Sequence, residues 1–302
     1  MLLVPVAAAA GITGSAMAQN GFDLSNARIP REEILPGGPA RDGIPSIDAP
    51  KFVPPEAATF LRDEDIVLSV THGQTTRAYP LRVLVWHEIV NDTIESEPVV
   101  ITYCPLCGTG MVFTRKSGGK VRTFGVSGLL YQSNVLMYDR ETESLWSQLK
   151  MEAVSGPAAG EKLRWLPSEH LTAKQWKAKY PSGQVLSTDT GYRRDYNSDA
   201  YADYFANDAT MFPVHRTRKE FPAKTWVLGV IAGGKAKAYP IEQLPDGKVV
   251  NDIVGGQQLR VAFHKAERRP EVRDASDAAV PAVMVFWFAW QAFYPGTEVW
   301  RR

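Results

Sequence analysis

The sequence predicts an α+β fold, predominantly β, with two internally repeated β-hairpin/short-helix/strand units and an antiparallel β insertion between them. Three observations predict this class: a gap-free internal similarity, short β-rich runs bounded by turn signals, and a proline after each expected hairpin. The chain has 302 residues, of which 44% are hydrophobic and 22% charged. A chain of this length and composition can bury a sizeable core.

The internal similarity relates residues 66–104 to residues 226–264 at a constant offset of 160 residues. Eleven of the 39 aligned positions are identical, and Ala-Tyr-Pro and Val-Asn-Asp both stand in register. The identities in the first copy are Val67, Leu68, Val70, Gly73, Ala78, Tyr79, Pro80, Leu84, Val90, Asn91 and Asp92. We interpret this pattern as an internal duplication.

Each copy begins with a β-rich run, Ile66–Thr71 or Trp226–Ile231, followed by a glycine-containing turn and a return strand. Pro80 or Pro240 then begins a short helix, because a proline already has a helical φ and its missing N–H is not needed in the first turn. A second β-rich segment, Val99–Tyr103 in the first copy, closes the unit.

The segments between the copies predict further elements. Alternation over 121–126 and 134–138, with turn signals beside both runs, predicts antiparallel strands. The pattern of Thr172–Tyr180 predicts one short amphipathic helix, which Pro181 ends. Residues 188–225 are polar and lack periodicity, so we expect a long ordered surface loop there.

The domain organisation predicted is a signal peptide over 1–18, an extended N-terminal wrap over 19–55, and a single domain over 56–302. An alanine-rich apolar run ends in Ala16-Met17-Ala18, a small-x-small pattern that signal peptidases accept. No Lys or Arg precedes Ala18, which indicates that the natural start lies further upstream. We therefore expect an exported, periplasmic or similarly located soluble protein with no membrane span in the mature chain.

Charge and cysteine usage narrow the function. Thirty-four Lys+Arg against 33 Asp+Glu leave a net charge of +1, so no global field attracts nucleic acid. The two cysteines, Cys104 and Cys107, are only three positions apart. They cannot form a disulfide framework for a chain of this length, and their spacing indicates a local chemical unit.

The Cys104-Pro105-Leu106-Cys107-Gly108 segment can direct both thiolates at one metal ion, since Pro105 keeps Cys104 extended and Gly108 permits the φ that closes the turn. The competing use of Cys-x-x-Cys is thioredoxin-like redox chemistry, in which a helix behind the motif lowers the thiol pKa. Two glycines and a β-like run follow here, so a helix is not indicated.

His87 is the first choice for a third ligand, because it follows the expected short helix and its counterpart in the second copy is Gly247. The alternative for His87 is a hydrogen-bonded core histidine. Two thiolates and an imidazole suit copper or zinc, whereas magnesium and calcium prefer oxygen. Met111 could serve as a soft axial ligand but fits better as a core residue, and His264 occupies the place of Cys104 in the second copy.

Four segments stand out as sequence motifs: Trp86–Asp92, Thr102–Cys107, Thr123–Leu130 and Met137–Ser144. Together they resemble the motifs of an exported bacterial and archaeal family catalogued as DUF3179. The likeness covers most of the chain after the signal peptide, and it places His87, Cys104 and Cys107 within the family motifs as a candidate site.

Three functions stay open at this point. The first is an exported metal-binding protein with a mononuclear site of His87, Cys104 and Cys107, active in copper redox chemistry or copper handling. The second is a metal-free thiol/disulfide redox protein, and the third is a non-catalytic binding module. Expected partners are the metal ion and a small molecule or redox partner, without nucleic acid.

Overall fold

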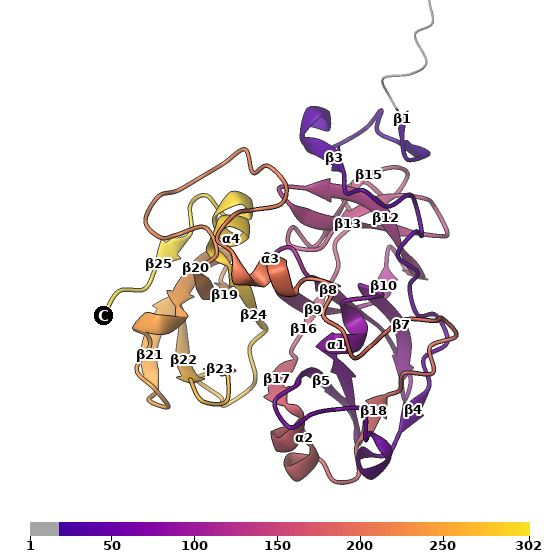
Figure 1. Ribbon diagram of the computed structural model, residues 1–302. Helices are drawn as coiled ribbons and strands as arrows, with labels where there is room; N and C mark the ends of the chain where they lie inside the picture. Colours follow the sequence, from indigo (N-terminus) through magenta and orange to yellow (C-terminus); the bar gives the residue numbers. More distant parts are fainter. Residues whose placement is uncertain (1–17) are drawn as a thin grey trace, which may run out of the picture.

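The structure is a computed structural model that describes residues 18–302 (Figure 1). The predicted signal peptide lies outside the described residues apart from its last position, Ala18. Strands make up 42% of the chain and helices 11%, so the protein is mostly β. Within residues 18–302, five sheets of three to five strands stand as five blades in a β-propeller arrangement.

The predicted α+β class with two repeated hairpin/helix/strand units is therefore wrong. The helices expected after Pro80 and Pro240 are only single turns, α1 (Leu81–Leu84) and η3 (Ile241–Gln243), and they form no layer. The strands that follow each hairpin pair in a different sheet from the hairpin itself, so each expected unit is divided between two blades. The sequence similarity thus relates parts of four sheets, in which some of the other strands come from distant parts of the chain.

Three sheets come mainly from the first two thirds of the chain. The first has the order β15 (Glu152–Ser155), β14 (Leu145–Ser147), β13 (Asn134–Asp139), β12 (Phe124–Tyr131) and β3 (Ile34–Pro36). The second has the order β16 (Trp165–Leu166), β9 (Thr109–Thr114), β8 (Glu97–Cys104) and β7 (Ile89–Ile94). The third has the order β17 (Glu169–Thr172), β5 (Ile66–His72), β6 (Thr75–Pro80), β18 (Gln184–Leu186) and β4 (Phe52–Val53).

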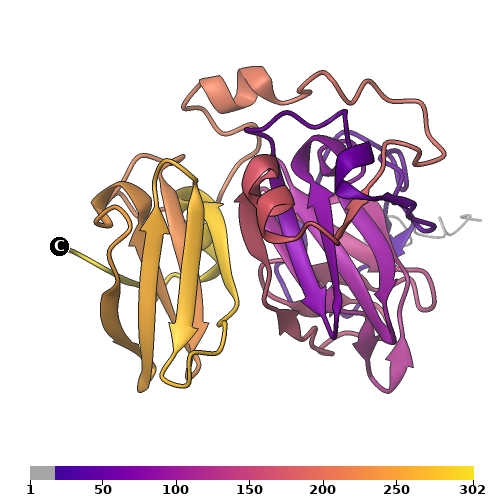
Figure 2. The ribbon, with the colours of Figure 1, turned by 90° about the horizontal axis from the view of Figure 1, so that it is seen from below.

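Two sheets from the last third lie together on one side of the molecule (Figures 1 and 2, orange and yellow). One has the order β24 (Ala282–Phe286), β19 (Trp226–Ala232), β20 (Lys235–Pro240) and β25 (Glu298–Val299). The other has the order β21 (Val250–Val254), β22 (Gln257–His264) and β23 (Arg269–Asp274). Two short ribbons complete the strands: β1 (Ala18–Gln19) with β2 (Phe22–Asp23), and β10 (Lys116–Ser117) with β11 (Lys120–Val121).

The helices are short. The amphipathic helix predicted over Thr172–Tyr180 is confirmed as α2 (Ala173–Lys179), which begins with a capping box between Thr172 and Gln175. The others are α3 (Ala202–Ala206), α4 (Trp287–Phe293), η1 (Arg31–Glu33) and η2 (Pro55–Ala57). In the part of the chain that the structure describes, no helix is both long and apolar enough to span a bilayer.

One large core links the two groups of sheets. It contains both cysteines together with Met111, Trp146 and Trp287, so the cysteine turn lies inside it. β8 is buried along its whole length, because the run Val99–Tyr103 is apolar or aromatic on both faces except at Thr102. The segment 188–225, which carries α3, passes from one group of sheets to the other (Figure 2, salmon).

Candidate dithiol site

The two cysteines lie on the turn of the β8–β9 hairpin. Cys104 is the last residue of β8 and pairs with Thr109, the first residue of β9. The Cys107 amide donates to the Cys104 carbonyl oxygen at 3.3 Å, and the Gly108 amide donates to that of Pro105 at 3.2 Å. Gly108 has a φ of +67°, which a residue without a Cβ adopts without strain. β9 follows at once, so no helix lies behind the motif.

Cys104 has an acidic thiol although it is buried. Its side chain is 1% exposed, and burial alone would raise its pKa. A hydrogen bond from the Cys107 side chain and backbone hydrogen bonds from Cys107, Val135 and Leu106 outweigh burial and lower the pKa below the ordinary value. Cys104 is therefore the more acidic thiol of the pair.

Cys107 has the opposite character. Its side chain is fully buried, and burial together with the neighbouring Cys104 raises its pKa well above the ordinary value. Its sulfur also lies 3.1 Å from the Ser133 carbonyl oxygen, which competes with the Cys104 sulfur for the single hydrogen of the Cys107 thiol. The Asn134 amide nitrogen lies 3.6 Å from the sulfur as a weak donor. The pair thus combines a thiol of lowered pKa with a thiol of raised pKa.

The tight turn between β12 and β13 supplies these contacts. Gln132 and Ser133 occupy the turn with φ values of 50° and 60°, the left-handed conformations that a two-residue hairpin requires. The backbone of this turn places the Ser133 carbonyl group and Asn134 next to Cys107. Sequence reasoning missed both residues, because the turn lacks the usual Asn-Gly or Asp-Gly signal.

A buried hydrogen-bond network fixes the hairpin turn against β13. The Gln148 side-chain oxygen accepts from Asn134 Nδ2 at 2.8 Å and from Thr109 Oγ1 at 2.8 Å. The Gln148 side-chain nitrogen donates to Thr102 Oγ1 at 2.8 Å. All four side chains are buried, so each depends on the others for its hydrogen bonds.

Glu88 is the carboxyl group beside the thiols. Its backbone oxygen accepts from the Tyr103 amide at 2.7 Å, which places it opposite the residue before Cys104. Burial raises the pKa of Glu88 well above its usual range, and the charge of Cys104 raises it further. The residue is 8% exposed and has a φ of 57°, a strained conformation for a side chain of this type. Sequence reasoning favoured its neighbour and missed Glu88.

His87 is turned to other partners. Its Nδ1 lies 2.8 Å from the Pro45 carbonyl oxygen, which can only accept, so Nδ1 carries the proton. Its Nε2 lies 2.7 Å from the hydroxyl of Tyr196, and burial lowers the pKa of the imidazole. Both ring nitrogens are therefore occupied. The structure brings Cys104 and Cys107 together but leaves His87 bonded elsewhere, as expected of a core histidine.

The metal prediction receives no support from this arrangement. Among residues 18–302, no group of three or more His, Cys, Asp or Glu side chains gathers where it could hold a metal ion. Met111 is a buried core residue of β9. His264 lies 3.9 Å from Glu271 on β23. A site of His87, Cys104 and Cys107 does not fit the contacts that His87 makes.

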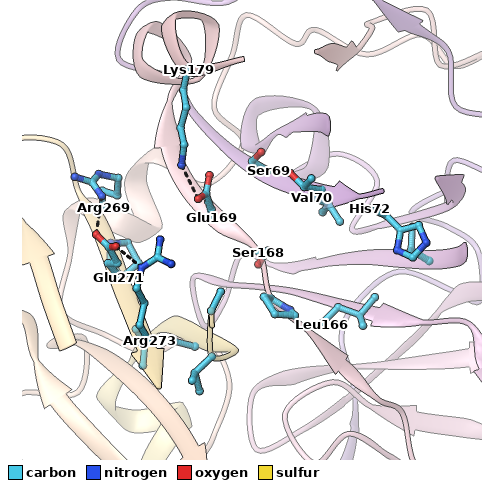
Figure 3. A pocket seen from close by; sticks show the side chains of 18 of the residues that line it. Ser69, Val70, His72, Leu166, Ser168, Glu169, Lys179, Arg269, Glu271 and Arg273 are labelled. Atoms are coloured by element: carbon cyan, nitrogen blue, oxygen red, sulfur yellow. Dashed lines mark hydrogen bonds and ion pairs between the residues drawn. The ribbon is translucent and has the colours of Figure 1, made fainter. Parts of the chain in front are cut away.

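A cavity of about 570 Å³ lies between the β17–β5 edge and β23 (Figure 3). Its charged side chains pair with one another: Lys179 Nζ lies 2.7 Å from Glu169, and Glu271 binds Arg273 at 2.7 Å and Arg269 at 3.2 Å. Neither cysteine lines it. This cavity therefore offers satisfied ion pairs rather than reactive groups.

Fold and site together define a mostly β protein with a buried, asymmetric dithiol at a hairpin turn. Residues 41–279 match the model of the family described as "Protein of unknown function (DUF3179)", and the chain belongs to this family. The resemblance inferred from the motifs is thereby confirmed. Neither a curated protein nor a solved structure matches the chain.

Proposed function

We propose that the protein is a thiol/disulfide redox protein in which Cys104 and Cys107 react without a bound metal. One observation carries the proposal: two thiols in hydrogen-bond contact have pKa values shifted in opposite directions, downward at Cys104 and upward at Cys107. Disulfide exchange needs a thiolate as nucleophile. Cys104 is thus the attacking residue and Cys107 the resolving one.

The reaction balances with a disulfide as the second reactant. The Cys104 thiolate attacks one sulfur of the disulfide, the S–S bond breaks, and one thiolate leaves. Cys107 then gives up its proton and attacks the Cys104 sulfur, which releases the second thiolate. The protein gains the Cys104–Cys107 disulfide, and the external disulfide is reduced to two thiols.

We assign Glu88, in its ionised form, as the proton acceptor of the second step. A carboxylate with a raised pKa is a stronger base than an ordinary one. The charge of Glu88 also acts on Cys107, where it raises the thiol pKa. The carboxyl group and the resolving thiol are therefore electrostatically coupled inside the same buried site.

Intact-mass analysis of the reduced protein with a small disulfide tests the proposal. We expect the parent protein to lose two hydrogen atoms, Cys107→Ser to keep a stable mixed disulfide, and Cys104→Ser to react far more slowly. Ser276→Ala, on an exposed turn, serves as the control and should behave as the parent. A parent protein that keeps both hydrogens, or a Cys104→Ser that reacts as fast as Cys107→Ser, refutes the proposal.

Copper binding by the two sulfurs alone is a second candidate. The observation that favours it is the direct contact of two thiols, which are soft ligands suited to copper(I). Elemental analysis after copper(I) loading tests it. His87→Ala should keep full copper content, because the imidazole bonds Pro45 and Tyr196. Loss of copper in Cys107→Ser supports this candidate, and a copper-free parent protein refutes it.

Export is part of the same proposal. The Ala16-Met17-Ala18 pattern supports cleavage before Gln19, and an exported compartment supplies the oxidising conditions in which dithiols cycle. N-terminal sequencing of protein recovered from the periplasm of a bacterial host tests it. A mature chain beginning at Gln19 is the expected result, and retention of the full chain in the cytoplasm contradicts it.

A further inference from the structure

A cavity of about 670 Å³ adjoins the turn that carries the cysteines. Tyr103 and Gly108 line it from the hairpin, and Trp226 and Phe286 line it from the β24–β19 sheet. Its volume is typical of a small-molecule site. Cys104 and Cys107 do not line it and are almost completely buried, so a folded protein cannot reach their sulfurs directly.

In the wall of this cavity, the positively charged side chain of Arg268 lies near Trp226, which in turn contacts the hairpin turn that carries the cysteines. The Arg268 guanidinium carbon lies 5.8 Å from the centre of the Trp226 ring. The same ring contacts Gly108 so closely that a Cβ added there would collide with Trp226 Cη2. Gly108 directly follows Cys107. In the described chain, no ion pair or hydrogen bond engages the Arg268 guanidinium, which is therefore available to an anion.

A second group in the wall lacks a partner. His170 Nε2 is buried, and no hydrogen bond to it is found within residues 18–302. The side chain is 6% exposed and lines the cavity. Burial, assisted by Arg268, lowers the pKa of His170 to about 4, so the imidazole is neutral at pH 7. A polar group of a ligand would satisfy this nitrogen.

The other charged side chains of the cavity either have partners within the protein or make no contact with the cysteine turn. Asp65 lies 3.1 Å from Arg82, and Lys224 Nζ donates to the Asn207 carbonyl oxygen at 2.7 Å. Asp199 accepts from the Tyr201 amide at 2.9 Å. The side chains of Arg62, Glu64 and Asp208 are exposed, and no contact relates them to Gly108.

We propose that this cavity admits a low-molecular-weight disulfide bearing a carboxylate, with Arg268 binding the carboxylate and His170 a second polar group. The proposal rests on the dithiol function and names its substrate class. The Cys104 thiolate attacks the bound disulfide, one carboxylated thiol leaves, and Cys107 releases the other as the intramolecular disulfide forms. Because neither sulfur lines the cavity, this step requires a local opening of the hairpin turn.

Three disulfides of different charge test the proposal on the reduced full chain: dithiobis(nitrobenzoic acid), which is anionic, dithiodipyridine, which is neutral, and cystamine, which is cationic. We expect Arg268→Gln to slow the reaction with the anionic reagent about tenfold, the effect of losing one charged contact. The rate with dithiodipyridine should stay unchanged. Arg260→Gln is the matched control, because Arg260 is an exposed arginine that pairs with Asp277 on another face.

The outcomes separate this inference from the dithiol function. If dithiodipyridine forms the Cys104–Cys107 disulfide but Arg268→Gln leaves the anionic rate unchanged, the substrate class is wrong and the redox function stands. The same conclusion follows if Arg268→Gln slows all three reagents equally, or if the parent protein reacts fastest with cystamine. If dithiodipyridine forms no intramolecular disulfide, the redox function itself fails.

Discussion

The Phe286 amide donates a 2.9 Å hydrogen bond to the Cys107 carbonyl oxygen, which joins the dithiol turn to the end of β24. The Phe286 ring also lies 4.2 Å, centre to centre, from the ring of Trp226, the residue that contacts Gly108. The C-terminal sheet is therefore part of the site. Substitutions on β24 or β19 should therefore affect the two thiols through these contacts, as substitutions in the cysteine segment do.

Gly108→Ala should destabilise the protein more than an ordinary left-handed glycine. The alanine pays the cost of a positive φ, about 1 kcal/mol, and its Cβ also collides with Trp226. We expect a total loss of about 3 kcal/mol in the free energy of unfolding. Gly119→Ala is the matched control, since its φ is +74° and no atom lies within 4 Å of the added Cβ. Equal losses in urea unfolding would contradict the Trp226 contact.

Glu88→Gln should reduce the pH dependence of stability. The pKa of Glu88 is raised in the folded protein, so the folded state binds more protons than the unfolded one above about pH 4.5. Stability therefore falls as pH rises through that range, and the neutral amide removes this contribution. In urea unfolding between about pH 4 and pH 8, the free energy of unfolding of the variant should increase relative to that of the parent as pH rises. Glu64→Gln, an exposed control, should follow the parent curve.

His170→Leu should reduce the loss of stability that the protein suffers at acid pH. The folded pKa of about 4 lies below the ordinary histidine pKa of 6.5, so the unfolded state binds the proton first as pH falls. Native stability is lost between these values, by about 3 kcal/mol in total. The variant should lose correspondingly less between about pH 7 and pH 4. His215→Leu, at an exposed position, is the control, and an acid loss equal in all three proteins would overturn the assignment.

Gln148→Leu should weaken the fold around the thiols. The substitution leaves Thr109 Oγ1 and Thr102 Oγ1 without their side-chain partner and removes an acceptor from Asn134. The expected loss is about 3 kcal/mol, the penalty for several unsatisfied buried groups. Gln257→Leu, on an exposed part of β22, should change stability by less than about 0.5 kcal/mol. Thermal unfolding that shows both variants alike would contradict the network.

Local signals predicted the cysteine site only in part. Pro105 and Gly108 indicated a sharp turn at a strand end, and the turn lies there. The third partner was assigned to His87, whereas the buried group coupled to Cys104 is Glu88. The left-handed conformation of Glu88 determines that Glu88, and not His87, lies on the side of the thiols. The side chain of glutamate does not indicate such a conformation in the sequence.

The fold was harder to predict than its strands. The hairpins at β5–β6 and β19–β20 follow from alternation and turns, which are local properties. The sheets depend on distant pairings, such as β16 with β9 and the parallel pairing of β18 with β6. Such contacts are selected by the burial of whole faces, which no short window of sequence records. The blade arrangement was therefore missed.

The placement of β3 has a consequence for self-association. Ile34–Pro36 covers the outer edge of β12 at its last three residues, which lead into the turn beside Cys107. Without this segment, β12 would present free N–H and C=O groups to any extended chain in solution. The N-terminal strand β3 thus protects the edge of this sheet. Fragments that begin after β3 would be prone to dimerise or aggregate by strand pairing at the exposed edge.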